Sequence, residues 1–393
     1  MTALRRIGGR GRGRRPPRRV RVPAGLLDVL RDGPAPLAAP PEGAADGGPL
    51  RVGVVVPQFR RGSGGHSTIA NLLRGLEARG HACSVWVVDE EGRHAGQSAE
   101  DVADLWRAFF GPLRGPVHLG LGGWAGADVA VATGWQTVPA VLRLGATAAR
   151  AYLVQDHEPD FYPASAEREW AAWTYRQGLH CVAASPWLAG LVAERYGAAS
   201  TSFDLGVDHE HYRAHPTHRR DDLVLFYARA VTPRRAVPLG LLALEELHRR
   251  RPTVEIALFG EAQPLDTPFP HRHLGVLEPH ALAHAYASAA VGLVLSLTNP
   301  SLIPQEMLAC GLPCVDLAGG SMLATFGADG PVTLAPFDPL ALCGAMETLL
   351  DDLALRAERS RAGIAWVAGR TWPAAAVQVE AGLRQALAGA ARA

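Results

Sequence analysis

The sequence predicts an α/β protein with two doubly wound, Rossmann-like parallel sheets. Short apolar runs alternate with segments of helical periodicity, which is the pattern of strand–helix–strand units. The runs are continuous rather than alternating, as in residues 50–57, and strands of that kind are buried on both faces. The alternation pauses near residue 206 and resumes at residue 223. A chain of 393 residues with 48% hydrophobic content can bury two cores, so we expect two domains.

The first half carries five expected strands, and we assign residues 50–205 to an N-terminal domain. The first strand leads through a glycine loop into a segment whose apolar residues recur at helical spacing. The strands are expected at residues 50–57, 83–88, 128–132, 150–155 and 181–184. The helices are expected at residues 69–76, 103–110, 138–144, 167–175 and 187–196.

The second half repeats this rhythm, and we assign residues 223–370 to a C-terminal domain. Residues 206–222 are polar and rich in histidine, but the spacing matches no compact metal site, so we expect a linker and no metal. Thr371 as cap and Pro373 in the first turn predict an amphipathic helix in residues 371–393, which needs a surface to cover. The other expected elements are strands at 223–229, 254–259 and 291–295 and a helix at 239–248.

Residues 1–49 are expected to form a disordered tail and linker rich in Arg, Pro and Gly. Residues 1–22 carry nine arginines and no acid, and no lysine occurs in the chain. Without those nine, 30 basic residues face 38 acidic ones, so the net charge of +1 hides a basic tail on an acidic body. We expect either a solvated extension or peripheral contact with an anionic membrane, with nucleic acid as a weaker alternative.

The length of the apolar runs and the number and spacing of the cysteines further limit the class of protein. No apolar run approaches the roughly 18–20 residues that a membrane-spanning helix needs, and the arginine-rich start lacks the apolar segment of a secretory signal. We therefore expect a cytoplasmic protein, with peripheral attachment at the inner membrane face as an alternative. The cysteines are scattered and odd in number, so we expect buried free thiols: Cys83, Cys181, Cys310, Cys314 and Cys343.

The segment after the strand at 291–295 is the first candidate site. Turn-forming residues, among them Thr298, Asn299 and Ser301, precede a short helix that starts near residue 302 and stops at Gly311. The N-terminus of such a helix suits a phosphate or diphosphate. Glu306 lies one turn inside, where a carboxylate accepts hydrogen bonds from sugar hydroxyls; alternatively, it only complements the helix dipole.

Two loops of the N-terminal half carry further candidates. Gly65 lets a ligand approach the backbone of the glycine loop, and His66 at the helix start is placed to donate to a phosphate or a sugar hydroxyl. Asp156, His157 and Glu158 follow a buried strand, at the edge where open parallel sheets bind ligands. We favour Asp156 and Glu158 as the catalytic pair. The alternative for His157 is a solvated surface histidine.

Arginines follow the first strand of the second half. Arg229 lies at the strand's carboxyl end, and Arg234 and Arg235 lie in the loop behind it. Guanidinium groups there are suited to clamp a diphosphate, whereas the alternative is a surface salt bridge.

These residues resemble glycosyltransferase family 4. The segment Glu306–Cys314 is similar to the family's loop-helix sequence, and shorter matches lie at 64–66, at Arg229 with Arg234 or Arg235, and at 273–277. The resemblance implies the GT-B fold, in which two Rossmann-like domains face each other across a cleft and a C-terminal crossover helix packs back on the N-terminal domain. It also implies hexosyl transfer from a UDP-, GDP- or dTDP-linked sugar to a glycan or lipid-linked saccharide, without metal or cofactor.

The resemblance also assigns roles to residues. The donor would lie in the C-terminal half, with Arg229 stabilising the leaving diphosphate, and the acceptor in the N-terminal half near His66 and His157. The donor set is Gly65, Arg229, Arg234, Arg235, Gly260, Leu277, Thr298, Asn299, Ser301, Leu302 and Glu306.

Two departures from the family matter. Thr298 stands where the family has the first of two glutamates, and the family's phosphate-binding lysine is absent. Residues 298–301 and 155–159 instead look similar to bacterial rhamnosyltransferases of cell-surface glycan synthesis, which implies a deoxysugar donor such as dTDP-rhamnose. Retention of the anomeric configuration is expected only if the chain belongs to family 4. A nucleotide-sugar epimerase and an inactive binding module are the alternatives.

Overall fold

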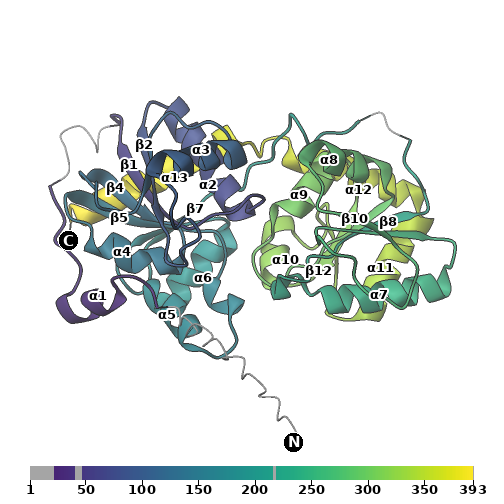
Figure 1. Ribbon diagram of the computed structural model, residues 1–393. Helices are drawn as coiled ribbons and strands as arrows, with labels where there is room; N and C mark the ends of the chain where they lie inside the picture. The colour runs from purple at the N-terminus through teal and green to yellow at the C-terminus, as the bar shows by residue number, and fades with distance from the viewer. Residues whose placement is uncertain (1–21, 40–46, 216–217, 393) are drawn as a thin grey trace, which may run out of the picture.

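The computed structural model describes residues 22–39, 47–215 and 218–392, which form two lobes side by side (Figure 1). Each lobe contains one wholly parallel sheet, of seven strands in the N-terminal lobe and six in the C-terminal lobe. The predicted fold class, two Rossmann-like parallel-sheet domains, is confirmed.

The seven-stranded sheet has the order β3-β2-β1-β4-β5-β6-β7. Chain direction along the sheet reverses between β1 and β4, and loops at such a switch point open a crevice at the carboxyl edge. The strands are β1 (Arg51–Pro57), β2 (Ala82–Val88), β3 (Val117–Leu119), β4 (Ala127–Ala132), β5 (Thr147–Val154), β6 (His180–Ala183) and β7 (Ser200–Ser202). Between them lie α2 (Gly64–Ala78), α3 (Ala99–Phe110), α4 (Val138–Arg143), α5 (Ala166–Thr174) and α6 (Pro186–Tyr196).

The six-stranded sheet has the order β10-β9-β8-β11-β12-β13, with its own switch point between β8 and β11. Its strands are β8 (Leu223–Tyr227), β9 (Glu255–Phe259), β10 (Arg272–Gly275), β11 (Val291–Leu293), β12 (Cys314–Leu317) and β13 (Thr333–Ala335). Its helices are α7 (Val237–Arg250), α8 (Pro279–Ser288), α9 (Leu302–Ala309), α10 (Gly320–Phe326), α11 (Pro339–Asp351) and α12 (Leu353–Val367).

Continuous apolar strands explain why both faces of each sheet are covered. All six residues of β4 are buried, as the uninterrupted apolar run predicts. In the N-terminal lobe, one face packs against α2 and α3 and the other against α4 and α6. In the C-terminal lobe, α7 and α11 cover one face and α8, α9 and α10 the other.

The last helix, α13 (Trp372–Ala390), returns to the N-terminal lobe. Its buried stripe, including Ala376 and Val379, packs against α2 and the core beside β5 and β6. Figure 1 shows this helix, in yellow, lying among the purple and blue elements of that lobe. The Thr371 hydroxyl accepts a hydrogen bond from the Ala374 N–H at 3.2 Å, which caps the helix where the sequence predicts.

Two segments connect the lobes and touch where they cross. Val207 donates its N–H to the Arg370 carbonyl at 2.9 Å and pairs with Thr371 in a short bridge. A Cβ on Gly206 would lie 2.5 Å from the Trp372 nitrogen, so only glycine fits this close approach.

Gly206→Ala is therefore expected to destabilise the protein by about 1–3 kcal/mol, because the added methyl group overpacks the crossing. Equilibrium unfolding in urea measures the change. Gly344→Ala is the matched control: nothing lies within 4 Å of a Cβ at that site on α11, so the substitution should be neutral or slightly stabilising. Equal stability of the two variants would contradict the crossing as a packed contact.

The expectation of disorder through residue 49 is wrong for residues 22–39. They include the helix α1 (Leu26–Asp32), whose Leu26 and Val29 are buried against the N-terminal lobe. Ala35 and Ala38 then donate backbone hydrogen bonds to Leu142 and Thr147, both at 2.8 Å. Two buried apolar side chains in a helix of seven residues are too short a pattern to predict from sequence. The tail at 1–21 and the linker residues 40–46 lie outside the described residues.

Three properties of the described residues bear on the class of protein. None of its helices is both long and apolar enough to cross a membrane. Within residues 22–39, 47–215 and 218–392, no group of three or more His, Cys, Asp or Glu side chains is arranged to hold a metal ion. All five cysteines are buried as free thiols, as predicted.

Candidate functional site

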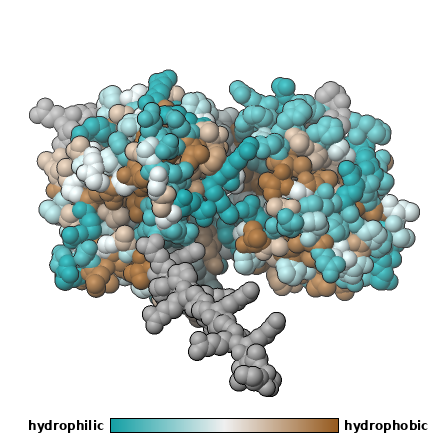
Figure 2. Space-filling model, viewed as in Figure 1, coloured by the Kyte–Doolittle hydropathy of each residue, from teal (hydrophilic) through white to brown (hydrophobic). Residues whose placement is uncertain are grey.

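Asp156 joins the two lobes where the carboxyl ends of their strands face each other. It follows β5 and is 7% exposed. Its Oδ1 accepts a hydrogen bond from the Asn299 N–H at 3.0 Å, and its Oδ2 accepts one from the Thr298 hydroxyl at 2.9 Å. The Nε of Arg234 lies 3.1 Å from the same Oδ2. We call Asp156, Arg234, Thr298 and Asn299 the interlobe cluster. On the surface, Figure 2 shows hydrophilic residues along the line between the lobes.

Asn299 uses all its polar side-chain atoms within this cluster. Its Nδ2 donates to the Gln155 and Ala184 carbonyls, both at 3.2 Å, and its Oδ1 accepts from the Ser185 hydroxyl at 2.8 Å. In this arrangement of the lobes these bonds occupy the Asn299 side chain and the Thr298 hydroxyl, and their donor contact stays a prediction. Both side chains bind the N-terminal lobe instead. Asp156 is likewise an anchor here rather than a free catalytic carboxylate.

The two adjacent arginines of η3 (Pro233–Arg235) have different surroundings. The Arg234 guanidinium lies over the Phe161 ring, 4.1 Å from its centroid, and burial lowers its pKa. Arg235 points into the C-terminal lobe, is 6% exposed and donates to the Ser296 hydroxyl at 3.2 Å. The Arg235 guanidinium is enclosed beside buried Asp316, so its diphosphate contact stays a prediction that this geometry does not favour.

Arg229 is a further cation at this edge of the C-terminal sheet. It follows β8, is half-buried, and donates from Nε to the Thr232 hydroxyl at 3.2 Å. Among the described residues no carboxylate pairs with it, in contrast to Arg234. A partly buried, unneutralised guanidinium favours binding of an anion.

The N-terminus of α9 faces the same region. Ser301 stands at the N-cap, yet its hydroxyl makes no capping bond. In the part of the chain that the structure describes, the Ser301 Oγ and the Gln305 Oε1 are buried without a hydrogen-bond partner. Unpartnered buried polar atoms beside free helical N–H groups indicate a place for a ligand that accepts hydrogen bonds. Leu302 meanwhile packs against the N-terminal core.

Glu306 lies one turn further into α9. It is 9% exposed, and its neighbours are Tyr286 of α8, Tyr212 and Asp208 of the connecting segment, and Cys310. Burial raises the pKa of Glu306 to about 8, against the opposing effect of the Tyr286 hydroxyl. The carboxyl group therefore titrates near neutral pH rather than simply complementing the helix dipole.

Glu306→Gln is expected to change the pH dependence of stability. Because the folded-state pKa lies above the ordinary 4.5, the wild type loses stability as pH rises from about 4.5 to 8, whereas glutamine carries no charge to bury. At pH 9 the variant should be more stable than the wild type by on the order of 2–4 kcal/mol, and at pH 4 equally stable. Denaturant unfolding across pH measures this, with exposed Glu358→Gln as control. Parallel pH profiles of Glu306→Gln and wild type would contradict it.

The structure gives both predicted acceptor histidines internal partners. The Nδ1 of His66 lies 2.7 Å from the Ser63 hydroxyl and its Nε2 3.2 Å from the Pro57 carbonyl, and burial lowers its pKa to about 4. His157 is fully buried, with Nδ1 2.6 Å from Asp160 and Nε2 2.7 Å from the Tyr196 hydroxyl. Each ring nitrogen of both histidines thus has an internal partner, and acceptor contact by either imidazole stays a prediction that this geometry does not favour.

Glu158 is also directed inward. Its Oε1 accepts from the Tyr152 hydroxyl at 2.7 Å and its Oε2 from the Trp135 N–H at 2.8 Å. Burial raises the pKa of Glu158 to about 7, and these two hydrogen bonds oppose the rise. In this geometry Glu158 holds the loop that carries Trp135, and its catalytic role stays a prediction.

Three other residues of the predicted donor set lie at this edge, and none of them has a polar side chain. Gly65 is exposed in the first turn of α2, where its carbonyl accepts a bond from Gln155 at 3.2 Å. Gly260 has φ of 93°, and a Cβ there would strike the Tyr227 ring at 2.5 Å. Leu277 is half-buried just beyond β10.

Two lobes with parallel sheets, opposed carboxyl edges and a last helix that crosses back define the GT-B fold, and this chain has it. Residues 222–322 match the model of the WsaF C-terminal domain. The chain is 28% identical over 340 residues to the O-antigen biosynthesis protein RfbC of Myxococcus xanthus, covering 84% of this chain and 26% of RfbC. It thus spans about a quarter of that relative's length.

Solved structures agree on the fold. Sucrose-phosphate synthase from Thermosynechococcus elongatus superposes with a TM-score of 0.65 at 16% identity, over 86% of this chain and 99% of that one. Anabaena HepE in complex with UDP-glucose gives 0.62 at 14% identity, over 86% and 100%. At these identities the similarity shows the fold alone.

Proposed function

We propose that this protein is a glycosyltransferase that moves a hexosyl group from a nucleotide-diphosphate sugar to a hydroxyl of a glycan or lipid-linked saccharide. The observation that carries the proposal is the N-terminus of α9, where the partnerless Ser301 hydroxyl and helical N–H groups lie in the same edge as unneutralised Arg229. Such a set accepts a diphosphate, the leaving group of a nucleotide sugar.

The comparisons support the same class. RfbC is named for O-antigen biosynthesis, a process that builds glycans, and HepE was solved with UDP-glucose. We extend both to this chain: the donor lies against the C-terminal lobe, with Glu306 accepting hydrogen bonds from its sugar or ribose hydroxyls. We further propose that the chain belongs to glycosyltransferase family 4 and that the transferred group is rhamnosyl, from dTDP-rhamnose. We also propose that residues 1–22 attach the protein peripherally to anionic lipids.

The chemistry assigned to this site is charge stabilisation. The acceptor oxygen forms the new bond to the anomeric carbon as the bond from that carbon to the diphosphate oxygen breaks, and the hydroxyl proton passes to the departing diphosphate. Negative charge grows on the leaving oxygen, and Arg229, the Ser301 hydroxyl and the N-terminus of α9 are placed to stabilise it. We expect transfer without a metal ion.

Ser301→Ala is expected to weaken nucleotide-sugar affinity about tenfold, because one hydrogen bond to a charged group is lost. Thermal-shift titrations with UDP-, GDP- and dTDP-sugars measure the change. Ser288→Ala is the matched control, since that hydroxyl bonds within its own helix at 3.0 Å. An unchanged affinity in Ser301→Ala would show that the diphosphate does not bind at the N-terminus of α9.

The experiment that tests the reaction is product analysis with radiolabelled nucleotide sugars, with and without a glycan extract as acceptor. A transferase releases nucleoside diphosphate and labels the glycan. An epimerised nucleotide sugar formed without acceptor would replace this proposal with the epimerase. Neither product from any donor would favour a binding module.

A further inference from the structure

The Asp156 carboxylate, which belongs to the N-terminal lobe, lies among hydrogen-bond donors that belong to the C-terminal lobe. These donors are the Asn299 N–H and the Thr298 hydroxyl, at 3.0 and 2.9 Å, and the Arg234 guanidinium, whose Nε lies 3.1 Å from Oδ2. A guanidinium, a backbone N–H and a hydroxyl that converge on one point are suited to bind a phosphate or carboxylate oxygen. The C-terminal lobe therefore contains an anion site, and a side chain of the other lobe fills it.

This anion site lies at the switch point of the six-stranded sheet. Arg234 follows β8 and Thr298 follows β11, and the switch point lies between these two neighbouring strands. Ligands of open parallel sheets bind in the crevice at such a point. The same two loops carry Arg229 and the N-cap residue Ser301. Asp156 thus occupies the part of the crevice next to the groups proposed for the donor diphosphate.

The loop that carries Asp156 also restrains the Arg234 side chain. Phe161, at the end of η2 (Glu158–Phe161) in the same loop, has its ring centroid 4.1 Å from the guanidinium carbon. The guanidinium therefore has an aromatic ring against it and a carboxylate at its Nε. A phosphate that approaches Arg234 in this arrangement meets the negative charge of Asp156, and two anions beside one guanidinium repel each other. Full pairing of Arg234 with a ligand requires that Asp156 withdraw.

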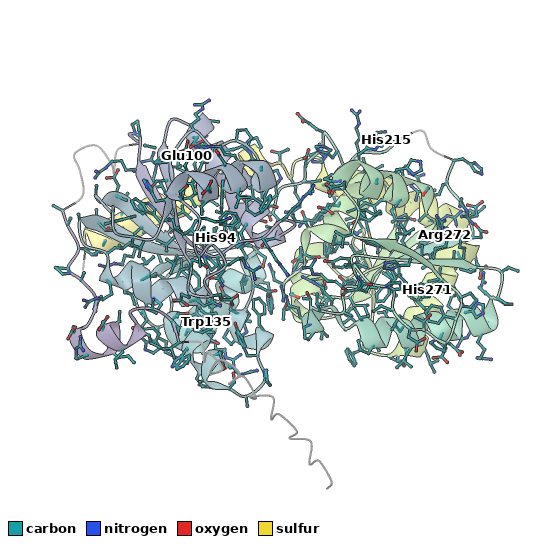
Figure 3. All side chains as sticks on the ribbon, viewed as in Figure 1. His94, Glu100, Trp135, His215, His271 and Arg272 are labelled. Carbon is teal, nitrogen blue, oxygen red and sulfur yellow. The ribbon has the colours of Figure 1, made fainter. Side chains whose placement is uncertain are left out.

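Buried contacts fix this loop to the N-terminal lobe. The His157 ring is fully buried, and its Nε2 lies 2.7 Å from the Tyr196 hydroxyl. Trp135, which Figure 3 labels in that lobe, donates its backbone N–H to the buried Glu158 carboxylate at 2.8 Å. A segment with many buried contacts does not open by itself at low cost. We therefore expect Asp156 to leave the anion site only when the two lobes move apart.

A second ion pair joins the lobes, but at the surface. Arg61 of the N-terminal lobe and Glu278 of the C-terminal lobe lie 3.1 Å apart, and their side chains are 74% and 76% exposed. A pair as exposed as this contributes little to the contact, because water and salt screen both charges. Its carboxylate provides a matched control for Asp156: it also bridges the lobes, but outside the anion site.

We propose that Asp156 is an internal competitor of the donor: its carboxylate fills the anion site of the C-terminal lobe in the ligand-free protein, and a phosphate group of the nucleotide sugar replaces it when the lobes separate. The proposal rests on the proposed transferase function and adds a regulation of the same site. It implies that the apparent donor affinity is lower than the affinity of the open site, since only molecules whose site is free bind the donor. Asp156 then controls donor binding rather than the chemical step.

Calorimetric titration of inorganic pyrophosphate and of UDP into wild type and Asp156→Asn tests this. The Asp156 oxygens accept from the His157 and Asn299 N–H groups on one side and from Thr298, beside Arg234, on the other. Asparagine presents an amide nitrogen to one of these sides, so its contact with the C-terminal lobe is weaker. Asp156→Asn should therefore bind both ligands about tenfold more tightly than wild type.

Glu278→Gln is the control, because it neutralises the exposed interlobe pair and should bind both ligands as wild type does. Equal affinity, weaker affinity or no binding in folded Asp156→Asn would overturn the proposal. Equal affinity together with a lower transfer rate would, in addition, return Asp156 to a catalytic role. If Asp156→Asn does not fold, wild type decides: small-angle scattering should show the lobes moving apart when pyrophosphate saturates the protein, and an unchanged profile would contradict the competition.

Nucleotide-sugar titrations, made in parallel, separate this proposal from the function on which it rests. If pyrophosphate binds Asp156→Asn more tightly but no nucleotide sugar binds any of the proteins, the competition stands and the transferase fails. If nucleotide sugars bind wild type and Asp156→Asn with equal affinity, the competition fails and the transferase stands.

Discussion

Arg229→Ala is expected to lower the rate of hexosyl transfer by roughly 10²–10³, the loss typical of one preorganised group that stabilises developing charge. Arg229 is half-buried just beyond β8, and its Nε donates to the Thr232 hydroxyl. No acid on the described part of the chain offsets its charge. Folding should survive, because this side chain supports little of the core. Steady-state rates with a donor and acceptor identified by product analysis measure the effect.

Two companion variants sharpen this prediction. Arg229→Lys should recover only part of the rate, because an ammonium group lacks the planar two-donor fork. Arg272→Ala, which removes an exposed arginine paired with Glu255 at 2.7 Å, should leave the rate unchanged. Full activity of Arg229→Ala, or its unfolding, would show that Arg229 is structural and that the diphosphate lies elsewhere.

Asn299→Ala is expected to destabilise the protein by roughly 2–4 kcal/mol and to loosen the contact between the lobes. The substitution leaves the Ser185 hydroxyl and the Gln155 and Ala184 carbonyls without their buried partner. Both lobes are affected, because these three groups lie on the N-terminal lobe and Asn299 on the C-terminal one. Urea unfolding measures the stability, and small-angle scattering measures the separation of the lobes.

Asn71→Ala is the matched control for this change. The Asn71 side chain contacts Arg74 within the single helix α2, so its loss should cost less than 1 kcal/mol and leave the scattering profile unchanged. If Asn299→Ala behaves like Asn71→Ala, the interlobe cluster contributes little, and the lobes are held mainly by the crossing at Gly206 and by α13.

The sequence predicted the sheets because their long central strands are continuous apolar runs. The expected strand at 50–57 corresponds to β1, and the expected helix after residue 302 to α9. Strands β3, β7, β10 and β13 were missed because each has only three or four residues and, unlike β11, no continuous apolar run extends beyond it. α1 was missed because its seven residues make only about two turns, too short for a clear periodic signal.

Within the site, spacing identified which loops matter but not where side chains point. Asp156, Arg234, Thr298 and Asn299 were all named, and they do meet, but they bind one another across the lobes. His66 and Arg235 are polar residues beside a predicted loop, and only tertiary packing shows that both are buried. Trp135, whose N–H binds Glu158, was not singled out, although it lies shortly after β4.

The most direct test of the account is calorimetric titration of UDP-, GDP- and dTDP-linked hexoses into wild type, Arg229→Ala and Ser301→Ala. The central claim is that a nucleotide sugar binds with its diphosphate between Arg229 and the N-terminus of α9. We predict that at least one of these donors binds the wild type with measurable heat. Its affinity should fall about tenfold or more in each variant while melting temperatures stay unchanged. Absence of binding by every donor, or equal affinity in all three proteins, would contradict the claim.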